Sequence, residues 1–571
     1  MPIVRSHGYL RESFAVAHRL RGAVGTTGVL LLPPLGYEDV SAYRPLRGLA
    51  DALAEGGRLV LRLDWPGLGD SAGDALDADL HHRRLETVRS GVAALRTHGC
   101  RAVVGIAVRA GGLLALEAGG FDELVLWGTP RSGARFLHEE RLFQRLAVAS
   151  FGAGAPPPPP GAEEAGGFLH GPSVIAAMSA FDPTTAVHTG LRRALLIGRD
   201  GAAPDSALAA GMRAGGVDVE ERRGEGLGAL LENAYNATLV APIREAVLTW
   251  VGGSGAEEAR HQPVRESQGS AVRLETHLQL DAAVERPWLE VGGAGALSGV
   301  VCEPVGGVRP GMAWTVFYNA GGIRRCGPNR LWTTAARALA AAGRPSLRVD
   351  VRDVGDSDGR SEPAADLEAM YAPSSIDDAV RAFDWVVDQG AGSVNVVGLC
   401  SGAFLGAQVS VRRSVRRAVL FNGLAFVWDD DARASSMTSQ VRGSLFDARR
   451  WRRLLTGKID AFALARAMVN KGRLRVQRWR SGAPGPDPVA ALLGEIRARG
   501  TDLQLVSSAG DPSIAYMEGH VNEGERPPLT LLEGADHTIR PTGLHGRVVA
   551  LILGQSQRDS NPCLCPERAP S

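Results

Sequence analysis

The sequence predicts an α/β protein of two tandem domains, each a mostly parallel β-sheet flanked by helices, with a larger helical cap on the second domain. Three observations support this fold class. The chain has 571 residues, a length typical of two or more domains. A ten-residue segment of the first half recurs in the second half with its spacing preserved. Strand-like apolar runs also end in turns before stretches of helical pattern, as at residues 394–397.

The recurring segment relates the two halves position by position. Residues 62–71 read RLDWPGLGDS, and residues 348–357, which lie 286 positions later, read RVDVRDVGDS. The same offset relates further pairs, namely Gly36 with Gly322 and Arg44 with Arg330. Because the register holds without gaps, we interpret the chain as two copies of one domain.

Composition marks where these copies begin and end. We expect a first domain at residues 1–252, a linker rich in Gly, Ser and charge at 253–271, and a second domain at 272–555. The polar tail at 556–571 is expected to be disordered. A proline-rich stretch at 151–167 indicates a reduced, flexible cap on the first domain.

The second domain carries the pattern of a nucleophile elbow. Residues 398–402 read GLCSG, directly after an apolar run and before a stretch of small residues that can be helical. Such a strand-turn-helix presents its central side chain, here Cys400, at the end of a sheet, and the two glycines leave room for the tight turn. The competing interpretation is a buried, structural cysteine beside an ordinary turn.

An acid and a base follow this cysteine in the chain. Asp511 ends a strand-like run in a Gly-Asp-Pro turn, and His537 follows another short run. Asp536 is an alternative orienting acid or only a turn former. The order nucleophile, acid, histidine is the order of a hydrolase triad, and it predicts Cys400, Asp511 and His537 as catalytic residues.

With these motifs, most of residues 272–555 resembles the α/β-hydrolase superfamily. The resemblance implies an oxyanion hole made by the backbone N–H of Ser401 and one from Gly321 or Gly322. Residues 327–330 (GPNR) resemble a branch associated with acyl transfer and with exopolysaccharide or secondary-metabolite gene clusters. A role in natural-product or polysaccharide biosynthesis is therefore implied.

The first copy lacks these chemical groups. Its elbow equivalent at residues 103–112 places either Arg109 or Ala107 at the nucleophile position, depending on which glycine is aligned, and neither residue can attack a carbonyl. No histidine occurs at residues 225–230, where the histidine loop is expected. We interpret this copy as a pseudoenzyme half that recruits a partner or forms a wall of the active site. The alternative is a scaffold kept for stability alone.

The second cap, expected at about 429–486, is basic. Twelve lysines and arginines face two acids between residues 441 and 480. Such runs are usually solvated helix faces, but above a thiol site they suit an acidic carrier protein or the phosphate of coenzyme A. The central candidates for partner binding are Arg449, Arg450, Arg452 and Arg453. Nucleic acid is the less favoured polyanion, since apolar residues recur here at helical spacing.

A cysteine in place of serine favours one reaction class. A cysteine that takes an acyl group from a phosphopantetheine thiol exchanges one thioester for another, so the group can be passed on. We expect acyl transfer through acyl-Cys400, from a donor on a carrier protein or coenzyme A. The alternatives are a thioesterase or carboxylesterase, in which water resolves the acyl-enzyme, and a noncatalytic tandem binding module. Ser401 is one residue past the apex and is disfavoured as the nucleophile.

Overall composition limits partners and location. The formal net charge of +1 indicates no general attraction to nucleic acid or membrane. The six cysteines are scattered without the spacing of a disulfide framework or a metal site, so we expect neither metal nor cofactor. The sequence shows no apolar run of about 20 residues and no leader pattern at its start, and we expect a cytoplasmic protein.

Overall fold

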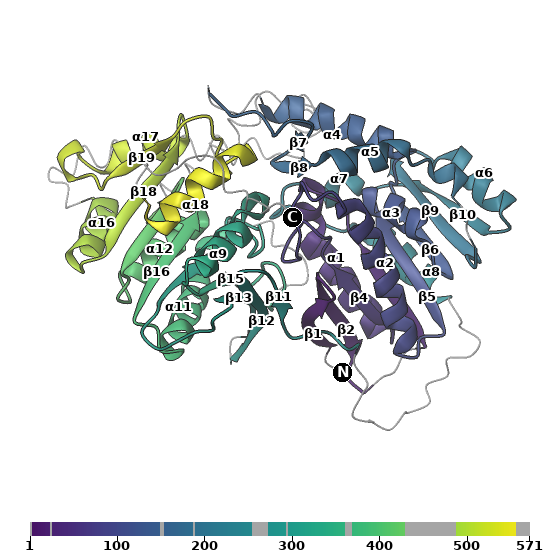
Figure 1. Ribbon diagram of the computed structural model, residues 1–571, viewed down its shortest axis with the longest axis horizontal. Coiled ribbons are helices and arrows are strands. Elements are labelled where there is room, and N and C mark those ends of the chain that lie inside the picture. Colours follow the sequence, from purple (N-terminus) through teal and green to yellow (C-terminus); the bar gives the residue numbers. More distant parts are fainter. Residues whose placement is uncertain are drawn as a thin grey trace, which may run out of the picture.

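The computed structural model describes residues 3–22, 26–148, 154–186, 189–253, 272–292, 295–359, 368–428 and 487–555. Within these ranges the chain forms two α/β domains that lie side by side, the first purple to blue and the second teal to yellow (Figure 1). The expected class, two α/β domains with mostly parallel sheets flanked by helices, is confirmed. The expected larger cap at 429–486, the tail at 556–571 and residues 254–271 of the expected linker lie outside the described residues.

The first domain is built on one sheet. Its strands are β1 (Ile3–Leu10), β2 (Ser13–Leu20), β3 (Thr27–Leu32), β4 (Leu59–Leu63), β5 (Ala102–Val108), β6 (Glu123–Trp127), β9 (Arg193–Asp200) and β10 (Asp218–Gly224). Their order is β1-β2-β4-β3-β5-β6-β9-β10, and only the pairings that involve β2 are antiparallel in this described sheet. A separate hairpin consists of β7 (Glu163–Ala165) and β8 (Phe168–His170).

The helices of this domain lie on both faces of the sheet. They are α1 (Tyr37–Glu55), α2 (Leu80–Thr97), α3 (Ala110–Ala118), α4 (Gly133–Val148), α5 (Pro172–Ala180), η1 (Pro183–Thr185), α6 (Ser206–Ala214), α7 (Leu227–Leu230) and α8 (Ala241–Gly252). Strand β3 is buried along its whole length, as expected of a central parallel strand. Its Val29 and Leu31 pack with α1 and α8, whereas Leu30 and Leu32 pack with α2 and α3.

The second domain has a longer sheet. Its strands are β11 (Leu278–Gln279), β12 (Ala283–Gly292), β13 (Gly295–Pro304), β14 (Ala313–Phe317), β15 (Ser346–Asp350), β16 (Ser393–Leu399), β17 (Arg417–Phe421), β18 (Asp502–Ser508) and β19 (Leu529–Leu532). Their order is β11-β12-β13-β15-β14-β16-β17-β18-β19. From β15 onward all pairings are parallel.

Helices again cover both faces of this sheet. They are η2 (Pro328–Arg330), α9 (Leu331–Ala341), α10 (Glu368–Tyr371), α11 (Pro373–Asp388), α12 (Ser401–Ser410), α16 (Pro488–Ala498), α17 (Pro512–His520), η3 (Glu523–Glu525), η4 (Thr542–Leu544) and α18 (His545–Leu553). Helices α9 and α18 share one core with Phe317 and Val397, and α11, α12 and α16 share the other with Val316 and Val396. Apart from the short β11, the strand order repeats that of the first domain.

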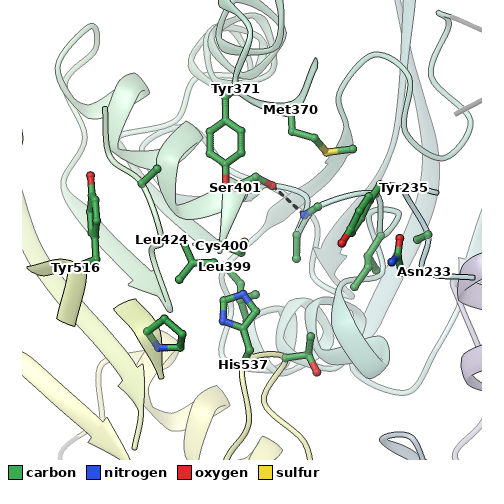
Figure 2. A pocket seen from close by; sticks show the side chains of 18 of the residues that line it. Asn233, Tyr235, Met370, Tyr371, Leu399, Cys400, Ser401, Leu424, Tyr516 and His537 are labelled. Atoms are coloured by element: carbon green, nitrogen blue, oxygen red, sulfur yellow. Dashed lines mark hydrogen bonds between the residues drawn. The ribbon is translucent and has the colours of Figure 1, made fainter. Parts of the chain in front are cut away.

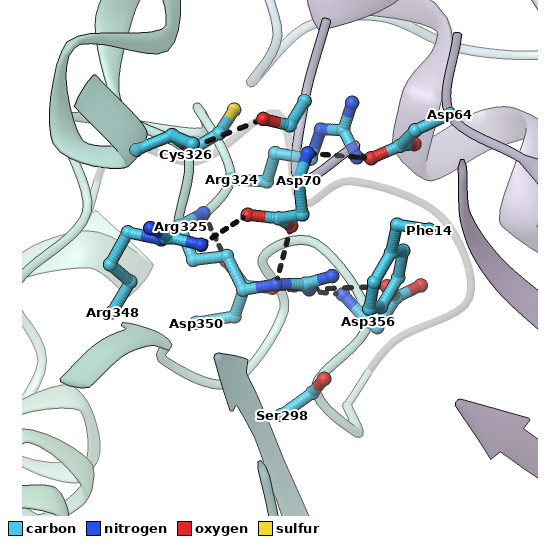
Figure 3. Close-up of polar contacts among 12 residues, drawn as sticks. Phe14, Asp64, Asp70, Ser298, Arg324, Arg325, Cys326, Arg348, Asp350 and Asp356 are labelled. Atoms are coloured by element: carbon cyan, nitrogen blue, oxygen red, sulfur yellow. Dashed lines mark hydrogen bonds and ion pairs between the residues drawn. The ribbon is translucent and has the colours of Figure 1, made fainter. Parts of the chain in front are cut away.

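The two domains meet through reciprocal contacts between equivalent residues. Arg62 pairs with Asp356 across the interface. The equivalent pair, Arg348 with Asp70 at 3.0 Å, can be followed in Figure 3. Each of these residues is related to its counterpart by the 286-residue offset. Similarly, Arg44 donates to the carbonyls of Gly355 and Ser357, and Arg330 donates to those of Gly69 and Ser71. Such reciprocity characterises the two-fold interface of a homodimer, here within one chain.

Candidate active site

The predicted elbow is present at the end of β16. Cys400 has φ 56° and ψ −113°, a conformation that non-glycine residues rarely adopt, and α12 begins at the next residue. A Cβ atom at Gly398 would lie 2.0 Å from the carbonyl oxygen of Gly402, and one at Gly402 would lie 2.5 Å from that of Asn319. Both glycines are therefore required by backbone contacts, as the pattern predicted.

The structure brings the predicted acid and base together. Asp511 lies just after β18 and caps α17, and its carboxylate lies 2.7 Å from Nδ1 of His537. His537 occupies the loop after β19 and lies beside Cys400 in the lining of the cavity (Figure 2). Asp536, the alternative acid, instead accepts bonds from the N–H groups of Thr538 and Arg540 within the same loop. Asp511 is therefore the carboxylate that orients the imidazole.

Charges and hydrogen bonds among Cys400, Asp511 and His537 shift the pKa values of His537 and Asp511. Burial opposes protonation of His537, but the negative charge of a Cys400 thiolate and hydrogen bonds to Asp511 and Cys400 outweigh it and raise the pKa of His537 well above its ordinary value. Burial would likewise raise the pKa of Asp511, but the bond from His537 lowers it overall. This direction favours the imidazolium form of His537. Its stabilising contribution is complete below pH about 6.5 and is lost as the pH rises through its higher folded pKa.

The predicted oxyanion residues surround the same point. Ser401 is the first residue of α12, and its Oγ accepts a 2.8 Å hydrogen bond from the N–H of Gly321. The Gly321 N–H can therefore serve an oxyanion only if the Ser401 hydroxyl rotates away. This bond also occupies the hydroxyl that was considered as an alternative nucleophile. Gly322 lines the cavity beside Gly321.

The cavity above Cys400 has a volume of about 570 Å³, within the range of small-molecule sites. Its aromatic and apolar lining includes Tyr371, Tyr516, Trp428, Met370 and Leu424. No arginine or lysine is among the lining residues in the described part of the chain.

Tyr371 is a site residue that the sequence reasoning missed. It lies in α10, and its ring stacks on Trp428 with 3.8 Å between ring centroids. Burial, followed by the negative charge of Cys400 and a hydrogen bond to it, raises the pKa of Tyr371 well above its ordinary value. The phenol therefore stays protonated. No local motif marks this residue, because its position depends on the packing of α10 over the elbow.

The equivalent point in the first domain has no nucleophile. Arg109 follows β5 with φ 53° and ψ −125°, which decides between the two alignments and places Arg109, not Ala107, at the elbow. Its guanidinium pairs with Glu38 and Glu139, both at 2.9 Å. Asp200 accepts from the backbone N–H groups of α7 in the segment where a histidine loop was expected. The position that corresponds to Cys400 is thus occupied by an arginine held in two salt bridges.

The first domain also contacts the loop that carries His537. The carboxylate of Glu164, in β7, accepts from the backbone N–H of Thr542 at 3.1 Å and from its hydroxyl at 3.2 Å. In the proline-rich segment, Ala155 lies against Gly534 and Pro156 lies against Gly543. These two glycines precede and follow His537 in the sequence. Rather than forming a free cap, the segment packs against the second domain at residues 154–156.

Three further features considered in the sequence are the arginines of the second cap, a metal site and a membrane span. Arg449, Arg450, Arg452 and Arg453 lie outside the described residues. The described residues contain no cluster of His, Cys, Asp and Glu suited to a metal ion. None of the described helices combines the length and the apolar character that a membrane span requires.

Comparison with known proteins finds similarity only at the level of folds. No family model matches the chain. No curated protein matches it either. A dienelactone hydrolase from Anabaena variabilis is 16% identical, covering 48% of this chain and 95% of its own, with a TM-score of 0.29. An acetyl xylan esterase from Paenibacillus sp. R4 is 16% identical, covering 49% and 86%, with a TM-score of 0.31. An α/β serine hydrolase homologue from Coxiella burnetii is 14% identical, covering 48% and 97%, with a TM-score of 0.29.

Proposed function

We propose that the protein transfers an acyl group from a thioester donor to an acceptor through an acyl-Cys400 intermediate. The observation that carries this proposal is a cysteine on a strained elbow, facing an imidazole that a carboxylate holds at 2.7 Å. A nucleophile, a base and an orienting acid in this arrangement perform acyl transfer on unrelated folds. An inert buried cysteine would not need the strained backbone.

The residues suggest a two-step exchange. The Cys400 thiolate attacks the thioester carbonyl, and the N–H of Ser401 stabilises the oxyanion. The bond between the carbonyl carbon and the donor sulfur then breaks, and the donor thiol leaves with the proton of His537. In the second step His537 takes the proton of the acceptor thiol, whose sulfur attacks the acyl carbon. The carbon–sulfur bond to Cys400 breaks, and the thiolate is restored.

The cysteine favours transfer over hydrolysis energetically. Each step forms and breaks one thioester, so the acyl-enzyme stays close in free energy to donor and product. A serine would form an oxoester and lose this balance. Hydrolysis is nevertheless the second candidate function, because 33% of the His537 side-chain surface is exposed and water can reach the base.

The donor is proposed to be held on the phosphopantetheine of an acidic carrier protein or of coenzyme A. The apolar, aromatic cavity suits the acyl group and the pantetheine arm. We propose that the phosphate of the donor is bound by Arg449, Arg450, Arg452 and Arg453. Replacing these four by Glu is expected to raise KM for a carrier-bound donor while leaving that for a short pantetheine thioester unchanged.

The decisive experiment is intact-protein mass spectrometry after incubation with a panel of acyl-pantetheine thioesters. Wild type should gain one acyl mass, Cys400→Ala none, and a second thiol should remove the group as a new thioester. Cys100→Ala is the matched control, since burial raises the pKa of that thiol to about 11 and it should not react. An adduct that survives in Cys400→Ala contradicts the proposal. Loss to free acid at a rate independent of acceptor thiol favours hydrolysis, and donor binding without any adduct favours a binding module.

A further inference from the structure

The cavity above Cys400 is built by both domains. Its lining includes Tyr37, Val40 and Ser41 from α1 of the first domain, and Asn233, Ala234 and Tyr235 from the loop after α7. Figure 2 shows Tyr235 on the side of the cavity opposite Tyr516, with its hydroxyl directed toward the space above His537. The domain without a nucleophile thus supplies a wall of the other domain's site.

The contact between this loop and the second domain is close. A Cβ atom at Gly322 would lie 2.9 Å from both the carbonyl carbon of Ala234 and the backbone nitrogen of Tyr235. The first-domain loop therefore touches the predicted oxyanion loop backbone to backbone. The Tyr235 ring also packs against the core of the second domain that contains Phe404 and Leu405. Its place beside the elbow is determined by these contacts.

The loop has a turn structure of its own. The backbone carbonyl of Asn233 accepts from the N–H groups of Asn236 and Ala237, both at 2.9 Å, and Thr238 N–H donates to the carbonyl of Ala229 at 3.0 Å. A turn closed by these bonds fixes the direction of each Cα–Cβ bond. The backbone of Tyr235 is thus held by the turn and its ring by the packing against the second domain, whereas the neighbouring Asn236 is not among the residues that line the cavity.

We propose that Tyr235 is a specificity-determining residue, which limits the size of the apolar acyl group that Cys400 accepts. This inference rests on the proposed function. A rigid ring in the wall excludes acyl groups that would overlap it, and in an apolar pocket each added or missing methylene changes discrimination by about 10- to 200-fold. The first domain would then be retained because it shapes the substrate site, although its own elbow carries Arg109.

The test compares kcat/KM for a short and a bulky acyl-pantetheine donor. Tyr235→Ala should shift the preference toward the bulky donor by about 10-fold or more, and Tyr235→Trp should shift it toward the short donor. Shifts of opposite sign cannot come from general destabilisation, and the Trp variant keeps the test open if the Ala variant fails to fold. Asn236→Ala, in the same turn but outside the lining, should keep the wild-type ratio.

Each outcome decides the question. An unchanged ratio in both Tyr235 variants overturns the inference, as does an equal loss for both donors, since a structural role alone predicts that. If wild type itself forms no acyl adduct with either donor, the proposed function fails first, and the inference falls with it. Wild-type acylation combined with an unchanged ratio refutes only the role of Tyr235.

Discussion

Replacing Asp356 with Asn tests whether reciprocal charge pairs hold the two domains together. The Asp356 side chain is fully buried, pairs with Arg62 and with Arg325 at 3.2 Å, and accepts a 2.6 Å hydrogen bond from Tyr43. Asn has nearly the same shape, so the substitution leaves no cavity. It removes one negative charge and leaves two buried guanidinium groups with fewer partners.

The expected magnitude follows from that imbalance. Breaking a buried ion pair by removing one partner costs about 3–5 kcal/mol. Because the amide oxygen of Asn can still accept from Tyr43 and Arg62, we expect the lower end, about 3 kcal/mol. For domains of this size, that corresponds to a fall in Tm of about 6–12 °C. Asp70→Asn, the reciprocal change, should have a similar effect, since Asp70 pairs with Arg348 and Arg325.

The pH dependence provides a second signature. Burial would raise the pKa of Asp356, but Arg62 and Arg325 outweigh it and hold the pKa well below its ordinary value. The charge therefore stabilises the fold fully above the unfolded pKa of about 4, and that contribution is lost as the pH falls through the folded pKa. The difference between wild type and Asp356→Asn should be constant near neutral pH and shrink in acid.

The assay is denaturant unfolding followed by circular dichroism, repeated between about pH 2 and pH 8 so that the series extends below the unfolded pKa of about 4. The control is Asp377→Asn, on the exposed face of α11, which should change stability by less than about 0.5 kcal/mol. A change in Asp356→Asn as small as in this control, with an unaltered denaturant slope, would refute the view that the interface charges are a major source of stability.

Three further predictions concern the site. Asp511→Asn should lower the pKa of His537 toward its ordinary 6.5, measured by NMR, and slow alkylation of Cys400 by about 10²–10⁴-fold; an unchanged His537 titration would contradict the assignment of the acid. Gly402→Ala should cost at least about 1–3 kcal/mol because its Cβ meets the Asn319 carbonyl, whereas Gly494→Ala, with open space around it, should be neutral or stabilising in thermal unfolding. Glu164→Ala should reduce Cys400 acylation by up to about 10²-fold, since Thr542 loses two bonds that hold the histidine loop; acylation at the wild-type rate would show that the loop keeps its place without them.

Charge at the interface also distinguishes the two copies. Asp39 of the first domain lies at the position equivalent to Arg325 of the second, given the 286-residue offset. Arg324 pairs with Asp39 at 3.0 Å and with Asp64 at 2.7 Å. Two identical second domains would place arginine opposite arginine at this point. The divergence in sign therefore favours pairing between unlike domains.

Local spacing was sufficient to predict the elbow. The strand, the two glycines and the helix around Cys400 lie within a few residues of one another, and the steric need for glycine is a property of the turn itself. The repeat likewise predicted the doubling of the sheet, because similar segments at equal spacing form similar folds. The choice between Arg109 and Ala107 was beyond the pattern, since glycines at two spacings fit it equally well and only the positive φ of Arg109 decides.

The sequence by itself determined the two-domain α/β class, the position of the elbow and the order of the candidate triad residues. These depend on short-range geometry and on periodicity, both of which are written locally in the chain. Tertiary structure alone decided that Tyr371 lines the cavity together with Cys400, that Tyr235 reaches the cavity from the other domain and that Glu164 holds the histidine loop. Glu164 and Thr542 are 378 positions apart. Contacts of this kind depend on how two folded domains are oriented, and no spacing within one segment encodes that orientation.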